Sequence, residues 1–129
     1  MTTTIHRKVR FGGPAKRHRR GQDAIGRTPR VARLMALAIH LEELVESGRE
    51  PDYAALARQA GVSRARITQI TNLTLLAPDI QEAVLHLPAV MKGRDPITER
   101  DLRPIAAEPH WAPQRALWNR LVNAACSRL

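Results

Sequence analysis

The chain has 129 residues, of which 43% are hydrophobic but only 3% aromatic, and its formal net charge is +9. This length suits one small domain with tails, and a core built from Leu, Ile, Val and Ala favours helices over sheets. The single cysteine, Cys126, excludes an intrachain disulfide, no apolar run approaches the roughly 20 residues of a membrane span, and the first residues lack the apolar stretch of a secretory signal.

Residues 1–27 are predicted to form a flexible, disordered basic arm. Residues 1–30 hold nine Lys or Arg side chains and one acid, whereas residues 31–129 hold twelve and eleven, so most of the net charge lies in the first part of the chain. Glycines and a proline interrupt the arm, which shows no apolar period. We interpret it as an element that binds phosphates or enters a minor groove, with a solubilising tail as the alternative. Its predicted DNA contacts are Lys16, Arg17, Arg19 and Arg20.

Residues 28–129 are predicted to form an all-α domain of five to six helices around a central helix pair. In the first helix Thr28 is expected to be the N-cap and Pro29 the first residue, and Gly48 ends the helix. Apolar residues recur at helical spacing between these ends. They are Val31, Leu34, Met35, Ala38, Leu41 and Val45.

Five more helices are expected, most of them with a recognisable start. They begin after Asp52, after Ser63, at Pro78, after Thr98 and near residue 112, and the first three end at Ala60, about Thr74 and before Pro88. Pro104 should distort or shorten the helix that Thr98 caps. The final helix, over residues 112–129, has an apolar face that either closes the core or forms a dimer interface. This face consists of Leu117, Trp118, Leu121, Val122 and Ala125.

The segment over residues 53–72 fits a helix-turn-helix. The small side chain of Ala57 lies where the two helices would cross, and Gly61 lies at the turn, where a left-handed backbone costs glycine least. Ile67 and Ile70 are three residues apart and face inward from the second helix. The alternative interpretation is an ordinary helix pair whose polar face is solvated.

The opposite face of the second motif helix suits the major groove of DNA. On a wheel of about 100° per residue, the side chains that point away from the core are Arg64, Ala65, Thr68, Gln69 and Asn72. Arg pairs with guanine, Gln and Asn pair with adenine, and a small Ala permits close approach or touches a thymine methyl. Arg66 lies nearer the core and is expected to bind a phosphate, as is Ser63. Arginines at a helix start oppose the helix dipole, and an anionic partner would offset that repulsion.

A longer pattern surrounds this motif. It runs through Ser63, Ile67, Leu73, Leu76, Pro78, Ile80 and the stretch 97–103. With these residues the chain resembles, over residues 50–107, the helix-turn-helix segment of ParB-type partition proteins and KorB-type repressors. The resemblance implies an all-helical domain whose second motif helix reads the major groove, and it implies no CTPase function. The whole chain also resembles small helix-turn-helix proteins that mobile elements carry beside site-specific recombinases.

No side-chain pattern indicates an enzyme, a cofactor or a metal site. The five histidines are scattered, one cysteine cannot supply zinc-ligand spacing, and neither a Ser-His-Asp signature nor a phosphate loop occurs. His40 and His86 are expected at the edge of the core. Trp111 and Trp118 are expected to be core or interface anchors, and Cys126 is expected to be a small packing group.

The sequence therefore predicts a sequence-specific double-stranded DNA-binding protein without catalysis, and regulation of transcription is the first role expected. Three alternatives stay open: a centromere- or recombination-associated architectural protein, an accessory subunit of a recombinase, and an RNA-binding protein that uses the arm. A homodimer on two half-sites would raise specificity and is expected. We expect a cytoplasmic, nucleoid-associated protein with no cofactor, no metal and no membrane contact.

Overall fold

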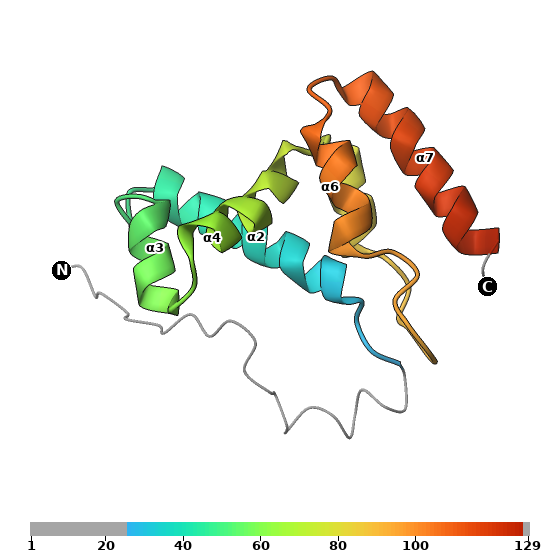
Figure 1. Cartoon of the computed structure of the whole chain (residues 1–129), viewed down its shortest axis with the longest axis horizontal. Helices are drawn as coiled ribbons and strands as arrows, with labels where there is room; N and C mark the ends of the chain where they lie inside the picture. Colours follow the sequence, from blue (N-terminus) through green and yellow to red (C-terminus); the bar gives the residue numbers. More distant parts are fainter. Residues whose placement is uncertain (1–25, 128–129) are drawn as a thin grey trace.

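The computed structural model describes residues 26–127, so residues 1–25 of the predicted arm, with Lys16, Arg17, Arg19 and Arg20, lie outside the described residues. Within residues 26–127 the fold is all-α, which confirms the predicted class, with six α-helices, one short 3-10 helix and no strand beyond an isolated bridge (Figure 1). The elements are α2 (Arg30–Glu46), α3 (Tyr53–Ala60), α4 (Arg64–Thr71), η1 (Asn72–Leu75), α5 (Pro78–Leu85), α6 (Glu99–Ala107) and α7 (Trp111–Ser127).

Helix α2 is the centre of the core. Its buried side presents Met35, Ala38 and Leu41, none of which has exposed surface, at the helical spacing expected from the sequence. Helix α2 packs against α4, η1 and α5, and it lies next to α4 in Figure 1. The core is continuous, and it extends to α7 through Trp118 and Ala125.

Three helices begin at the capping residues that the sequence predicts. The carboxylate of Asp52 accepts a hydrogen bond from the Ala55 amide (2.8 Å), and the Ser63 hydroxyl accepts one from the Arg66 amide (3.1 Å). Thr98 caps α6 in a reciprocal capping box with Asp101. Such caps satisfy amides that lack an intrahelical partner. The helix runs on to Ala107, so Pro104 does not end it.

The start of α2 differs from the prediction. Pro29 is the N-cap, and Thr28 makes no cap hydrogen bond. The first helical amide, that of Arg30, instead donates to the carboxylate of Asp95 (3.0 Å) in the α5–α6 loop. Asp95 is 65 residues further along the chain. The local sequence around Thr28 therefore could not show that a distant carboxylate accepts the hydrogen bond of the first helical amide.

The same loop also holds the residues before α2. Arg27 forms a two-way backbone bridge with Val90, and its guanidinium pairs with Asp95 and donates to the Gly93 carbonyl. Gly26 lies against the loop so closely that a Cβ there would stand 2.6 Å from the Met91 sulfur. Gly26 and Arg27, the last two residues of the predicted arm, therefore contact the α5–α6 loop.

Helix α7 is attached through a buried polar side chain that the sequence analysis did not identify. Gln114 is 1% exposed and makes three hydrogen bonds to backbone groups. Its oxygen accepts from the Ala77 amide (2.8 Å), and its nitrogen donates to the carbonyls of Leu75 (3.1 Å) and Glu108 (2.8 Å). Gln114 thereby joins the start of α7 to the η1–α5 turn. Because buried polar groups require partners, these hydrogen bonds fix the position of the start of α7 against the η1–α5 turn.

The apolar face of α7 mostly closes the monomer core. Trp118 and Ala125 are buried, and the other three residues of the predicted face are partly buried against the same core. This observation matches the core-closing alternative, and it leaves little of that face for a dimer interface. Trp111 differs from Trp118 because it is 50% exposed. The guanidinium of Arg115 lies over the Trp111 ring, 5.9 Å from the ring centre. Trp111 is therefore not a core anchor.

Candidate nucleic-acid interface

Helices α3 and α4 lie within residues 53–72 and are joined by a short turn. Gly61 adopts a left-handed backbone (φ 69°, ψ 28°), and the Val62 amide closes the turn on the Ala57 carbonyl (3.1 Å). A left-handed residue is the common way to end one helix and redirect the chain into the next. Ala57 is buried at the packed side of α3, where the prediction required a small residue.

One face of α4 is anchored in the core. Ile67 and Ile70 are buried, as predicted from their spacing. Thr71 is also buried, which the sequence analysis did not foresee, and its hydroxyl donates to the Ile67 carbonyl (2.9 Å). The α-helix ends at Thr71 and continues as η1, whereas one helix to about Thr74 was expected. The anchored face therefore ends in a tighter turn than predicted.

The other face of α4 is open. Every residue predicted to read bases is exposed in the structure, together with the capping serine, and none of them is acidic. The Thr68 hydroxyl donates to the Arg64 carbonyl (3.0 Å). The hydroxyl oxygen can therefore still accept a hydrogen bond. We call this surface the α4 face. It consists of Ser63, Arg64, Ala65, Thr68, Gln69 and Asn72.

Arg66 lies beside this face and is already paired with a carboxylate. Its side chain is 28% exposed, and Nη1 is 2.7 Å from Oε1 of Glu99 at the start of α6. The same nitrogen donates to Oε1 of Gln69 (3.3 Å). The sequence prediction gave Arg66 a phosphate partner, and such a contact would have to compete with Glu99. Arg103 lies 3.6 Å from the same Glu99 oxygen.

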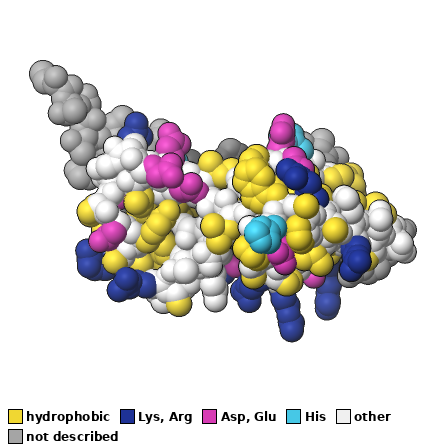
Figure 2. Space-filling model, turned by 90° about the horizontal axis from the view of Figure 1, so that it is seen from above, with side chains coloured by type: hydrophobic (Ala, Val, Ile, Leu, Met, Phe, Trp, Pro, Cys, Tyr) yellow, Lys and Arg dark blue, Asp and Glu magenta, His cyan; other side chains and the backbone are white. Residues whose placement is uncertain are grey.

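Charged side chains of both signs are visible on the face shown in Figure 2. Lys and Arg side chains project mainly from one edge of the surface in Figure 2, and a group of Asp and Glu side chains lies toward the other edge. Two carboxylates in the last turns of α2, Glu42 and Glu46, lie near Tyr53. Burial raises the pKa of the Tyr53 hydroxyl, and these two carboxylates raise it further.

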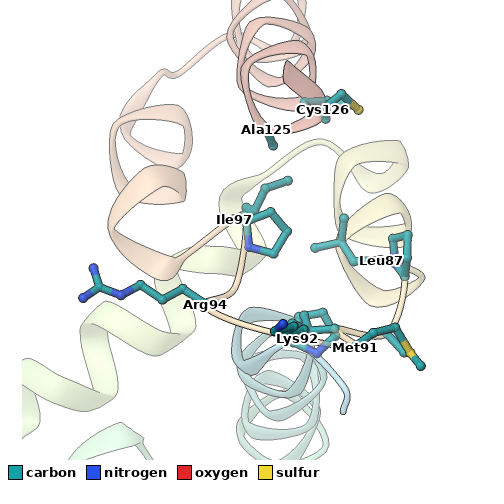
Figure 3. Close-up of a pocket in the computed structure, with 13 residues that line it drawn as sticks. Leu87, Met91, Lys92, Arg94, Ile97, Ala125 and Cys126 are labelled. Carbon is teal, nitrogen blue, oxygen red and sulfur yellow. The ribbon is translucent and has the colours of Figure 1, made fainter. Parts of the chain in front are cut away.

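A cavity of about 490 Å³, with no α4 residue in its lining, lies between the α5–α6 loop and the end of α7 (Figure 3). Its walls are mainly apolar, and they include Leu87, Ile97 and Ala125. Arg94 contributes to the lining, but its side chain extends away from the cavity (Figure 3). Cys126 also lines it and is exposed, so its thiol is not the buried packing group that was expected.

Within residues 26–127, no group of three or more His, Cys, Asp or Glu side chains could hold a metal ion. His40 and His86 are exposed and do not pack at the core edge, contrary to the prediction. In this part of the chain no helix combines the length and the hydropathy needed to cross a membrane. No protein-family model, no curated protein and no solved structure matches the chain.

Proposed function

We propose that this protein is a sequence-specific double-stranded DNA-binding protein that regulates transcription, and that α3 and α4 act as its helix-turn-helix. One observation carries the proposal: α4 is anchored by Ile67 and Ile70 while the whole α4 face stays exposed and free of acids. A short helix whose buried side is packed in the core, and whose exposed side carries Arg, Gln, Asn and a small residue, fits the width of a major groove. These exposed side chains can form hydrogen bonds with base edges there.

The residues of the α4 face have distinct proposed roles. Arg64 is the guanine-binding side chain, because its guanidinium has no described protein partner and can donate two parallel hydrogen bonds. Gln69 and Asn72 can each pair with adenine. Ala65 lets the helix approach closely, and Ser63 contributes a hydroxyl and the helix-start amides to a phosphate.

The N-terminal arm is proposed to supply affinity while α4 supplies specificity. Residues 1–27 hold eight Lys or Arg side chains and one acid, and each phosphate that they neutralise adds about −0.9 to the slope of log affinity against log salt. A protein lacking residues 2–24 should bind more weakly, with a slope flattened by several units and the same preferred sequence. An unchanged affinity and slope would make the arm a solubilising tail.

The decisive experiment is selection of bound duplexes from random DNA, followed by titration of the selected duplex, an unrelated duplex and an RNA of equal length. We expect one preferred duplex and weak RNA binding at near-physiological salt. Arg64→Ala should cost on the order of 1–3 kcal/mol and relax preference at one base position. Arg120→Ala removes the same charge from an exposed position on α7 and is the matched control. Equal affinity for all duplexes would refute the proposal.

A homodimer remains part of the proposal, since two half-sites about one helical turn apart would multiply the specificity of a single α4. Sedimentation at micromolar concentration, with and without the selected duplex, tests it. A monomer that protects one asymmetric half-site would remove the dimer and leave the DNA-binding proposal intact.

A further inference from the structure

Three side chains from two helices form a continuous chain of contacts beside the α4 face. Glu99 Oε1 accepts from Arg66 Nη1 at 2.7 Å, and the same nitrogen donates to Gln69 Oε1 at 3.3 Å. Glu99 has a side-chain exposure of only 14%, so its carboxylate is partly shielded from water. A charge-assisted contact in such a place is stronger and better directed than one in bulk solvent. The guanidinium of Arg66 is therefore held between α6 and the exposed Gln69.

This arrangement orients the amide of Gln69. Its oxygen faces Arg66, because the reverse orientation would set two donors, the amide nitrogen and the guanidinium, against each other. The amide nitrogen then points away from Arg66 and has no described partner. The oxygen keeps a second lone pair, so the oriented amide can donate to N7 of adenine and accept from its N6 amino group. Guanine offers acceptors at both positions and does not complement it.

We propose that Glu99 is a positioning residue which, through Arg66, sets Gln69 to select adenine at one position of the DNA site. The proposal rests on the function proposed above and adds a residue of α6, outside the helix pair, to the determinants of specificity. Glu99 can be tested without removing the cap of its helix, because Thr98 and Asp101 form the capping box by themselves.

The first test measures base preference. Gln69→Ala identifies the position that Gln69 reads, and duplexes carrying each of the four base pairs there are then compared. The unmodified protein should prefer adenine by roughly tenfold, and Glu99→Ala or Arg66→Met should lower this to about threefold or less. Arg103→Ala is the matched control, since Arg103 contacts the same carboxylate at 3.6 Å but not Gln69, and it should keep the full preference. An unchanged preference in Glu99→Ala would overturn the proposal.

The second test needs no DNA, so it separates failure of this proposal from failure of the proposed function. Nuclear relaxation of side-chain amides in the full chain should show Gln69 nearly as restricted as Gln81, whose nitrogen donates to two carbonyls. In Glu99→Ala the Gln69 amide should become mobile, while the Gln114 amide keeps its signals and reports an intact fold. A Gln69 amide that already moves freely in the unmodified protein, or does not respond to Glu99→Ala, would overturn the proposal whether or not DNA binds.

Discussion

Helices α4 and α7 are held in place in different ways. The 8-residue α4 follows the left-handed Gly61 and is capped by the Ser63 side chain, and two isoleucines pack it in the core. At the start of the 17-residue α7, Gln114 makes hydrogen bonds to Leu75 and Ala77, which lie 39 and 37 residues earlier in the chain. The turn and the cap that begin α4 are made by neighbours in the sequence, whereas the hydrogen bonds at the start of α7 join residues that only the fold brings near.

This difference has a consequence for how each helix responds to mutation. Loss of an α4 contact removes packing from the centre of the core, because α4 lies against α2, α3 and η1. Loss of the Gln114 contacts leaves that centre intact but frees the start of α7 from the η1–α5 turn. The predictions below test this contrast, beginning with the largest expected effect.

Ile67→Ala should lower the free energy of unfolding by about 3 kcal/mol, because a fully buried side chain leaves a cavity among α2, α4 and η1. Chemical denaturation measures the loss. Ile39→Ala is the matched control, since Ile39 is 37% exposed on α2 and its truncation should cost less than about 1 kcal/mol. Equal losses in the two variants would mean that α4 is not seated in the core as described.

Gln114→Met should cost about 2 kcal/mol, since a side chain of similar size leaves the Ala77 amide and two carbonyls without partners. Amide hydrogen exchange should accelerate in α7 and leave α4 little changed. Gln59→Met, at an exposed side chain that donates to Glu50, should cost under about 0.5 kcal/mol. If exchange in α4 rises as much as in α7, the two helices form one cooperative unit and the contrast fails.

Gly61→Ala should cost about 1 kcal/mol through backbone strain alone, because no atom lies within 4 Å of the position that a Cβ would take. Gly61→Asn should cost less, since asparagine tolerates the left-handed region better. Thermal unfolding of the pair separates strain from packing. Identical losses for Ala and Asn would show that the turn does not require φ near 69°.

The smallest expected effect is a pH dependence at α7. The Arg115 side chain donates to the Asp79 carboxylate (3.0 Å), and this hydrogen bond lowers the pKa of Asp79 below its ordinary value of 3.8. A lowered pKa means that the pair stabilises the fold above about pH 3.8 and that this contribution is lost as the pH falls through the folded-state value.

Asp79→Asn should therefore lower the melting temperature slightly at neutral pH and not at strongly acidic pH. In an Arg115→Gln background the substitution should have no such pH dependence. A pH dependence that persists without Arg115 would assign the effect to the α5 start, where a carboxylate also meets the helix dipole.

Most of the fold could be predicted because its signals are short-range. Asp52, Ser63 and Thr98 each cap an amide three residues away, so a local pattern suffices to place the starts of α3, α4 and α6. The predicted burial of Ile67 and Ile70 follows in the same way from helical spacing, and the exposed α4 face is its complement.

The features that the sequence did not reveal all depend on distant partners. Asp95 takes the place predicted for Thr28 at the start of α2, and Glu99 occupies the guanidinium of Arg66 that was expected to meet a phosphate. Gln114 gave no signal, because an isolated glutamine in an amphipathic helix is ordinarily a solvated residue. The base contacts and the role of the arm remain predictions.

The exposed thiol on α7 has a consequence for redox chemistry. Cys126 is the single cysteine of the chain, so the only disulfide that it can form with protein is one that covalently joins two molecules. Air oxidation at high concentration would therefore produce a cross-linked pair whose geometry is set by the ends of two α7 helices and not by the spacing of DNA half-sites. A dimer that disappears when a reductant is added would be this cross-linked species, whereas one that persists would be held by noncovalent contacts.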